Sequence, residues 1–221
     1  MNFSYNVRII ALSVTISLGM IAQATTAKAA ETETLLVAGG CFWCVESDFE
    51  SVKGVKEVIS GFAGGTVKNP TYKQVTAGGT GHYEAAQIQF DPAVVSLDQL
   101  LSMYFRSVDP TDAGGQFCDR GDSYRTAIFA KDAVQKAAAT QAKAQAQAAL
   151  GQTIVTPVLG KTTFYPADAY HQDYYKSSER LAFSSVGLAV KKSVAYKRYR
   201  DGCGRDQRVK QLWGSAAPFT H

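Results

Sequence analysis

Hydrophobic and polar residues along this chain follow the periodicities of both strands and helices. Residues 35–38 are a short apolar run that ends at Gly39 and Gly40, and this pattern predicts a buried strand closed by a tight turn. From Val45 to Gly54, apolar residues recur at helical spacing. The chain is therefore expected to pass from a strand into a helix just after Gly40.

Four further segments have the properties of strands. Residues 55–62 and 83–90 alternate between apolar and polar positions, and a loop rich in Gly, Asn and Pro that contains Tyr72 separates them. Residues 124–129 and 153–159 are two more candidates. We expect these segments to form a sheet that draws on most of the chain.

Three later segments predict helices. The first begins at Ser96, whose spacing from Gln99 is that of a capping box. The second covers residues 133–150, which are mostly Ala, Gln and Lys, and it stops before Gly151. The third covers residues 167–180.

The order of these elements indicates the fold class. Strands and helices interleave without a regular β-α-β period, and no repeat or linker divides the chain. This order predicts an α+β fold, in which a mixed sheet packs against helices as a two-layer sandwich.

The N-terminal residues have the pattern of a secretory signal peptide. Arg8 precedes an apolar run over residues 9–22, and Ala-Lys-Ala at residues 27–29 is a small-x-small cleavage site. The apolar run is shorter than the roughly 20 residues that a membrane-spanning helix needs. We therefore expect a signal peptide over residues 1–29, a single domain over residues 30–221, no membrane span, and export to the periplasm.

Charge argues against one class of partner. The chain carries 23 basic and 19 acidic residues, and Arg8 and Lys28 fall within the expected signal peptide, so the mature chain has a net charge of +2. Such a balance gives no electrostatic reason to expect nucleic-acid binding. Basic residues near the C-terminus lie among acids and aromatics and predict a solvated face. These are Lys191, Lys192, Lys197, Arg198, Arg200 and Arg205.

Cysteine content adds candidate chemistry. The chain has Cys41, Cys44, Cys118 and Cys203, and an even number in an exported protein is typical of a disulfide framework. Cys41, however, follows Gly40 at the expected turn from strand to helix. Unpaired N–H groups and the helix dipole at such a turn can stabilise a thiolate, so Cys41 is a candidate nucleophile.

Two aromatic residues lie between the first two cysteines. Phe42 and Trp43 offer an apolar surface beside Cys41 that could receive a methyl-thioether group. The alternative is that both side chains belong to the hydrophobic core.

The sequence Gly-Cys-Phe-Trp-Cys-Val-Glu over residues 40–46 resembles the signature of the peptide methionine sulfoxide reductases of the A type, which act on the S epimer. Four more blocks resemble that family in the same order, and the resemblance extends from about Leu35 to Trp213. The blocks are Asn-Pro-Thr-Tyr at 69–72, Thr-Gly-His-Tyr-Glu at 80–84, Asp-Arg-Gly-Asp-Ser-Tyr-Arg-Thr-Ala-Ile-Phe at 119–129 and Tyr-His-Gln-Asp-Tyr-Tyr at 170–175.

The resemblance implies a role for each matching position. It makes Cys41 the nucleophile, Glu84 a buried acid, Tyr72 and Tyr124 hydrogen-bond donors to the sulfoxide oxygen, and Asp119 a positioning residue. Chemistry agrees, because the oxygen must be protonated as a thiolate attacks the sulfur, and this needs an acid with a raised pKa. Phenol hydroxyls add donors without adding charge.

A second thiol is needed after the first step. Attack by Cys41 leaves a sulfenic acid, which condenses with a thiol to a disulfide and water. Cys203 is the first candidate, because its glycine neighbours would let a tail fold over the site. Cys44 is the competitor, since it forms a Cys-x-x-Cys pair with Cys41. No role is assigned to Cys118, for which the alternative is a small buried apolar residue.

The resemblance also sets expectations for partners. It implies a monomeric enzyme without a cofactor that acts on free or protein-bound methionine sulfoxide and is regenerated by a dithiol donor of thioredoxin type. Two alternatives remain. One is a general thiol-disulfide oxidoreductase that uses Cys41 and Cys44, and the other is a non-enzymatic domain held by two disulfides. His171 is interpreted as structural.

Overall fold

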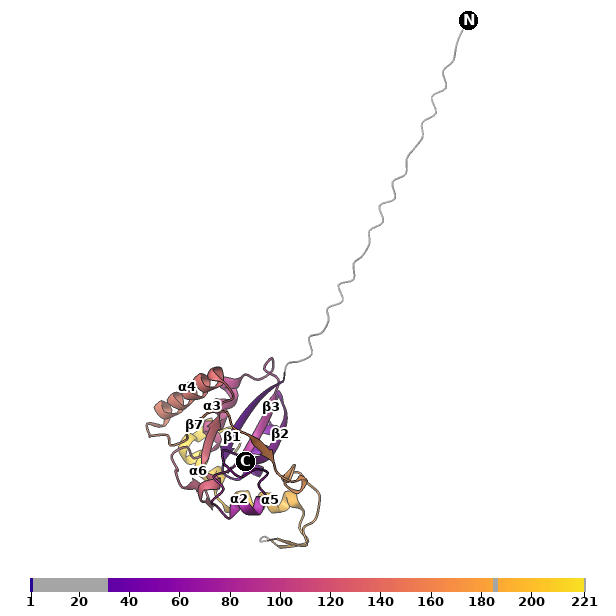
Figure 1. The fold of residues 1–221 in the computed structure, drawn as a ribbon, viewed down its shortest axis with the longest axis vertical. Coiled ribbons are helices and arrows are strands. Elements are labelled where there is room, and N and C mark those ends of the chain that lie inside the picture. Colours follow the sequence, from indigo (N-terminus) through magenta and orange to yellow (C-terminus); the bar gives the residue numbers. More distant parts are fainter. Residues whose placement is uncertain (2–31, 185–186, 221) are drawn as a thin grey trace.

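The computed structural model describes Met1, residues 32–184 and residues 187–220. Apart from Met1, the expected signal peptide lies outside the described residues. A six-stranded sheet forms the centre of the domain (Figure 1). Its strands are β1 (Glu33–Gly39), β2 (Val55–Ala63), β3 (Tyr83–Phe90), β6 (Thr126–Phe129), β7 (Val158–Leu159) and β8 (Phe164–Pro166).

The sheet is mixed, as predicted. Its strand order is β7-β6-β1-β3-β2-β8, and all neighbours are antiparallel except β6 and β7. The strand predicted over residues 153–159 is confined to β7. Before it, the hydroxyl of Thr156 hydrogen-bonds that of Thr126 at 2.8 Å, and Pro157 has no N–H to donate.

Helices and short elements complete the described part of the chain. The helices are α1 (Phe42–Glu50), α2 (Tyr72–Thr76), α3 (Leu97–Ser107), α4 (Ala133–Leu150), α5 (Lys192–Gly202) and α6 (Arg205–Trp213). The single 3-10 turns are η1 (Asp122–Tyr124), η2 (Ala169–His171) and η3 (Gly214–Ala216). Two small hairpins consist of β4 (Gly115–Gln116) with β5 (Asp119–Arg120) and β9 (Phe183–Ser184) with β10 (Gly187–Leu188).

Local signals account for the helix ends. Ser96 and Gln99 exchange the two hydrogen bonds of a capping box at the start of α3. Asp132 caps α4, which ends at Gly151 in the left-handed conformation (φ +63°). None of the helices in the described part of the chain is both long and apolar enough to cross a bilayer.

The two faces of the sheet differ. On β1, Leu35 and Val37 pack with residues of α1, α3 and α4, whereas Leu36 and Ala38 point to the opposite face. Figure 1 shows α3 and α4 side by side, and the two helices contact each other. The packing of these helices on one face of the sheet confirms the predicted two-layer α+β fold.

Residues 167–180 do not form the predicted helix; only the single turn η2 is helical. The side-chain amide of Gln172 donates to the carbonyl of Ser60 at 2.8 Å and accepts from its N–H at 2.9 Å. Asp173 has a positive φ of 56°, and its N–H donates to the buried carboxyl group of Glu46 at 2.5 Å. These tertiary hydrogen bonds replace those of a helix.

The predicted solvated face at the C-terminus is also partly wrong. Lys192, Arg200 and Arg205 are buried. Arg200 forms an ion pair at 2.6 Å with Asp48, which lies on α1 and is itself buried, and Arg205 lies 3.7 Å from the same carboxylate. The guanidinium of Arg205 also donates to the carbonyl of Gly39 at 3.2 Å. Buried charge therefore fixes α5 and α6 to the strand-to-helix turn.

We expect Asp48→Ala to destabilise the protein by about 3–5 kcal/mol, because it removes the carboxylate that the buried guanidinium groups of Arg200 and Arg205 share, although Arg200 keeps its ion pair with Asp206 at 2.7 Å. The matched control is Asp122→Ala, which removes an exposed ion pair with Arg125 and should cost less than about 1 kcal/mol. Urea unfolding measures both free energies. Equal losses in the two variants would contradict this account of the C-terminal helices.

Candidate active site

The turn between β1 and α1 places Cys41 at the N-terminus of the helix. Gly40 has φ +80°, and a Cβ atom at this position would lie 2.6 Å from the Cβ of Gln116, so only glycine fits. The carbonyl of Cys41 accepts hydrogen bonds from the N–H groups of Cys44 at 3.1 Å and Val45 at 3.4 Å. The candidate nucleophile thus lies at the predicted strand-to-helix turn.

Cys41 and Cys44 are free thiols, with 6% and 2% of their surfaces exposed. Both pack with Tyr174, Tyr196 and Tyr199, which we call the tyrosine cover. All three tyrosines come from the C-terminal part of the chain. The two thiols therefore share one enclosed environment.

Their surroundings shift the pKa values of the two thiols in opposite directions. Burial, followed by contact with Cys44 and the charges of two carboxyl groups, raises the pKa of the Cys41 thiol well above its ordinary value. The expectation that the helix N-terminus stabilises a Cys41 thiolate is therefore wrong for this closed arrangement. The pKa of Cys44 is lowered by the hydrogen bond from Cys41 and by the charges of Arg205 and Arg200, against the effect of burial. Negative charge in this pair thus belongs on Cys44.

Glu84 supplies the acid that the chemistry requires. It lies on β3 opposite Phe62 of β2 and is only 2% exposed. Its Oε2 accepts the N–H of Phe42 at 3.0 Å, while Oε1 is buried and has no partner among the described residues. Burial raises the pKa of Glu84 to about 8. The carboxyl group is therefore mostly protonated at neutral pH, with one oxygen free to act.

Tyr72 and Tyr124 lie beside this carboxyl group. Tyr72 is the first residue of α2, and Tyr124 is the last residue of η1. Burial raises the pKa of both phenols, and the charge of Glu84 is the second cause in each case. Both hydroxyls therefore remain protonated donors. The structure brings together the predicted nucleophile, acid and donors.

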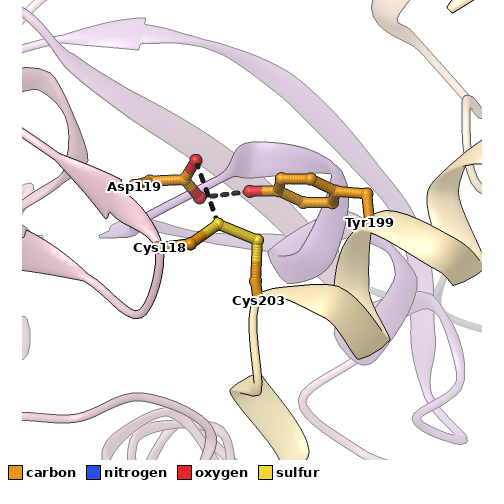
Figure 2. The surroundings of a disulfide bond; sticks show 4 residues. All are labelled: Cys118, Asp119, Tyr199 and Cys203. Atoms are coloured by element: carbon orange, nitrogen blue, oxygen red, sulfur yellow. Dashed lines mark hydrogen bonds between the residues drawn. A yellow bond between two sulfur atoms is a disulfide. The ribbon is translucent and has the colours of Figure 1, made fainter. Parts of the chain in front are cut away.

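Asp119 connects this group to the C-terminal helices. The hydroxyl of Tyr199 on α5 donates to its Oδ2, as Figure 2 shows. Burial raises the pKa of Asp119, and its charge in turn raises the pKa values of Cys41 and Glu84. Asp119 thus holds one tyrosine of the cover in place and influences both reactive groups.

The remaining two cysteines form a disulfide (Figure 2). Cys118 and Cys203 are 85 residues apart in sequence, with their Cα atoms separated by 4.9 Å. Cys118 is exposed, so its interpretation as a small buried residue is wrong. The structure contains one disulfide and two adjacent thiols, whereas the non-enzymatic alternative requires two disulfides.

The aromatic pair is more enclosed than the sequence suggested. Phe42 is only 1% exposed and packs in the core against Phe62. The ring of Trp43 stacks on Tyr174, with 3.8 Å between centroids and an interplanar angle of 9°. His171 lies against the same group, since its ring centroid is 4.3 Å from that of Tyr72. A substrate methyl group would reach the face of Trp43 that Tyr174 covers only if Tyr174 moved.

Sequence reasoning missed the contributions of Tyr174, Tyr199, Arg200 and Arg205 to this site. These residues lie more than 120 positions after Cys41, and no local pattern relates them to it. The one sequence feature that could have indicated them is the density of aromatic and basic residues in the C-terminal segment, but this pattern predicts a solvated face.

Two clusters among the described residues have ligand atoms close enough for a metal ion. In the first, Cys118, Asp119 and Cys203, both sulfurs are engaged in the disulfide. In the second, two of the three carboxylates are bridged by Lys176, at 2.6 Å from Glu50 and 2.7 Å from Asp173. Side chains in both clusters are therefore already engaged by other partners.

Comparison with known proteins places this arrangement in a family. The model of the peptide methionine sulfoxide reductase family matches residues 33–203. The chain is 48% identical over 191 residues to peptide methionine sulfoxide reductase MsrA 2 of Rhizobium meliloti, covering 86% of this chain and 88% of the relative. It is 46% identical over 194 residues to the MsrA 2 of Caulobacter vibrioides, covering 87% and 91%. This chain therefore belongs to the peptide methionine sulfoxide reductase family.

Solved structures agree with the fold. Mxr1 from Saccharomyces cerevisiae in its reduced form superposes with a TM-score of 0.62 at 29% identity, covering 66% of this chain and 86% of that one. Methionine sulfoxide reductase A of Corynebacterium diphtheriae gives the same TM-score and identity, covering 74% and 84%.

Proposed function

We propose that this protein reduces methionine S-sulfoxide, free or within oxidised proteins, to methionine. The observation that carries the proposal is the carboxyl group of Glu84, which is buried and protonated, bonded through one oxygen to the N–H next to Cys41, and unpartnered at the other. An acid in this state can protonate an oxygen that a nucleophile at Cys41 displaces.

The first step transfers oxygen from the substrate to Cys41. The Cys41 sulfur attacks the sulfoxide sulfur and forms an S–S bond with it, while the Cys41 proton passes to the adjacent sulfur of Cys44, where the hydrogen bond from Cys41 and the charges of Arg205 and Arg200 favour the thiolate form and lower the pKa. Glu84 donates its proton to the sulfoxide oxygen, while the phenols of Tyr72 and Tyr124 stabilise the developing charge. The hydroxyl group then passes from the methionine sulfur to the Cys41 sulfur as the S–S bond between the two sulfurs breaks. Methionine leaves, and Cys41 is oxidised by two electrons to a sulfenic acid.

The second step forms a disulfide. Cys44 lies three residues after Cys41 in the first turn of α1 and shares its cluster, so its sulfur can attack the sulfenic acid and release water. Cys203, the first candidate from the sequence, is bonded to Cys118 in this structure. Cys44 is therefore the better resolving thiol.

The other site residues bind or position. Trp43 is the candidate surface for the methyl-thioether once Tyr174 moves aside, and Phe42 fixes Glu84 through its N–H. Asp119 acts through Tyr199, which it holds over the thiols.

The cellular setting is part of the proposal. The N-terminal pattern supports export to the periplasm, and a disulfide with an exposed sulfur is typical of an oxidising compartment. A monomer regenerated by a protein dithiol of thioredoxin type fits a catalytic cycle that ends in a disulfide.

A general thiol-disulfide oxidoreductase is the competing function, and the Cys41 and Cys44 pair favours it. Two assays of the full chain decide between them. The proposal expects dithiothreitol-driven consumption of methionine S-sulfoxide, with the R epimer untouched, and negligible reduction of insulin disulfides. Insulin reduction without sulfoxide consumption would favour the competitor.

The pKa of Glu84 predicts the pH dependence of the first step. Because the protonated carboxyl group is the active form, the single-turnover rate of methionine formation should fall as pH rises through about 8. Stopped-flow quenching of pre-reduced protein between pH 6 and 10 measures this rate. A rate that rises steadily across the whole range would rule out Glu84 as the acid.

A further inference from the structure

We infer that Glu46 is a positioning residue, which holds Tyr174 over Trp43 and so controls the access of substrate to the active site. The inference rests on the proposed function, in which Trp43 is the surface for the methyl-thioether. It gives a role to a buried carboxyl group that takes no part in the two chemical steps.

Glu46 links three parts of the chain. It lies on α1, three residues after Trp43, and its surface is 0% exposed. Its Oε2 accepts the hydroxyl of Ser60 on β2 at 2.6 Å, and its Oε1 accepts the N–H of Asp173 at 2.5 Å. This one side chain therefore connects α1 and β2 to the backbone of residues 170–175.

The backbone that Glu46 holds is next to the residue that covers Trp43. Asp173 directly precedes Tyr174, whose ring stacks on Trp43 with 3.8 Å between centroids. Asp173 has φ +56°, and a non-glycine residue keeps such a conformation only where its surroundings fix it. When the hydrogen bond from its N–H to Glu46 is lost, the backbone at Asp173 can relax, and Tyr174 moves with it.

The chain before Asp173 is held in a different way. The side-chain amide of Gln172 exchanges hydrogen bonds of 2.9 and 2.8 Å with the backbone of Ser60, and these bonds involve no charged group. His171 lies against Tyr72, with 4.3 Å between ring centroids. Movement of the cover therefore begins at Asp173 and leaves Gln172 and His171 in place.

The surroundings of Glu46 favour its neutral form. Burial, followed by the charges of Glu50 and Asp173, raises the pKa of Glu46 to about 7, although its two hydrogen bonds act in the opposite direction. Lys176 is the cation of this cluster and bridges the other two carboxylates, at 2.6 Å from Glu50 and 2.7 Å from Asp173.

This environment couples the cover to pH. A glutamate in water has a pKa of about 4.5, so the closed arrangement binds the Glu46 proton more tightly than an arrangement that admits water to the carboxyl group. The resulting stabilisation of the closed arrangement is complete below about pH 4.5 and is lost as pH rises to about 7. Because one proton leaves on opening, the ratio of open to closed molecules should increase by up to about 10-fold per pH unit in this range.

Fluorescence quenching measures the cover without any reaction. The chain has two tryptophans, Trp43 and Trp213, so Trp213→Phe leaves Trp43 as the only emitter. In that background, quenching by acrylamide should increase from pH 5 to pH 7 and then level off. With Glu46→Gln, which is neutral at every pH, it should stay weak throughout.

The matched control in the same background is Glu57→Gln, which changes an exposed glutamate on β2 and should keep the pH-dependent profile. His171 also stacks on Trp43, and burial lowers its pKa, but it is present in every variant and cannot produce a difference between them. Identical quenching profiles for Glu46→Gln and Glu57→Gln would overturn the inference. A lowered melting temperature of Glu46→Gln together with such a profile would show that the carboxyl group only stabilises the fold.

Single-turnover kinetics of the pre-reduced full chain complete the test. The methionine S-sulfoxide concentration that gives half the maximal rate should fall by at least about 10-fold from pH 5 to pH 7 in the wild type, and should stay at its pH 5 value in Glu46→Gln. The maximal rates of the two proteins should be alike, because Glu84, with a pKa of about 8, stays protonated over this range. Equal half-saturating concentrations at every pH would overturn the inference and leave the proposed function intact. No methionine from either protein would instead overturn the proposed function.

Discussion

Cys41→Ser should abolish methionine formation, because a neutral hydroxyl is far less nucleophilic toward sulfur than a thiol. The readout is methionine released by pre-reduced protein, with dithiothreitol as the reductant in a second assay. Cys118→Ser is the matched control, since it should still release methionine in its first turnover. Because Cys41 is buried and close in size to serine, circular dichroism should show an unchanged fold. Dithiothreitol-driven sulfoxide reduction by Cys41→Ser would contradict its assignment as the nucleophile.

Glu84→Gln should lower the rate of the first step by between about 10² and 10⁴, the usual contribution of a general acid. Glutamine keeps the shape of the protonated carboxyl group and can still accept the N–H of Phe42, but it has no acidic proton to deliver. The control is Glu57→Gln, which changes an exposed glutamate on β2 and should leave the rate unaltered. Single-turnover kinetics at pH 7 compare the two.

Phenylalanine variants of Tyr72 and Tyr124 test whether a phenol, instead of Glu84, is the proton donor. Tyr72→Phe and Tyr124→Phe should each reduce the rate less than Glu84→Gln, because one donor remains when the other is removed. If Glu84→Gln kept near wild-type activity while one tyrosine variant lost it, the proton donor would be that phenol.

The sequence predicted those parts of the fold whose causes are local. The capping box at Ser96, the composition of residues 133–150 and the glycines before Cys41 each act within a few residues, and the structure confirms the elements they indicate. The helix predicted over residues 167–180 is absent because side chains of Gln172 and Glu46 hold the backbone in another conformation. The periodicity of the segment cannot reveal these hydrogen bonds.

Ion pairs between residues far apart in the sequence account for the second wrong prediction. The sequence predicts a solvated face for Arg200 and Arg205 because charged side chains are usually exposed, yet both are buried against Asp48, more than 150 residues earlier in the chain. The pairing of Cys118 with Cys203 spans 85 residues and is likewise beyond any local signal.

The position of the catalytic acid could be predicted from the sequence, but the burial of the site under the tyrosine cover could not. Glu84 shares the face of β3 with Ala86, Ile88 and Phe90, so strand alternation alone places its carboxyl group on the buried side. That position accounts for the raised pKa which the chemistry requires. The closure of the site by tyrosines from the C-terminal segment follows from tertiary packing, and so the reversed charge preference of Cys41 and Cys44 could not be foreseen.

Thiol titration of the pre-reduced full chain, mixed with methionine sulfoxide and no other reductant, tests the central claim most directly. The account predicts that two thiols disappear for every methionine formed, and that only the S epimer reacts. If the S epimer left the thiols unchanged, or if thiols were lost without methionine appearing, the proposed sulfoxide reduction at Cys41 would be contradicted.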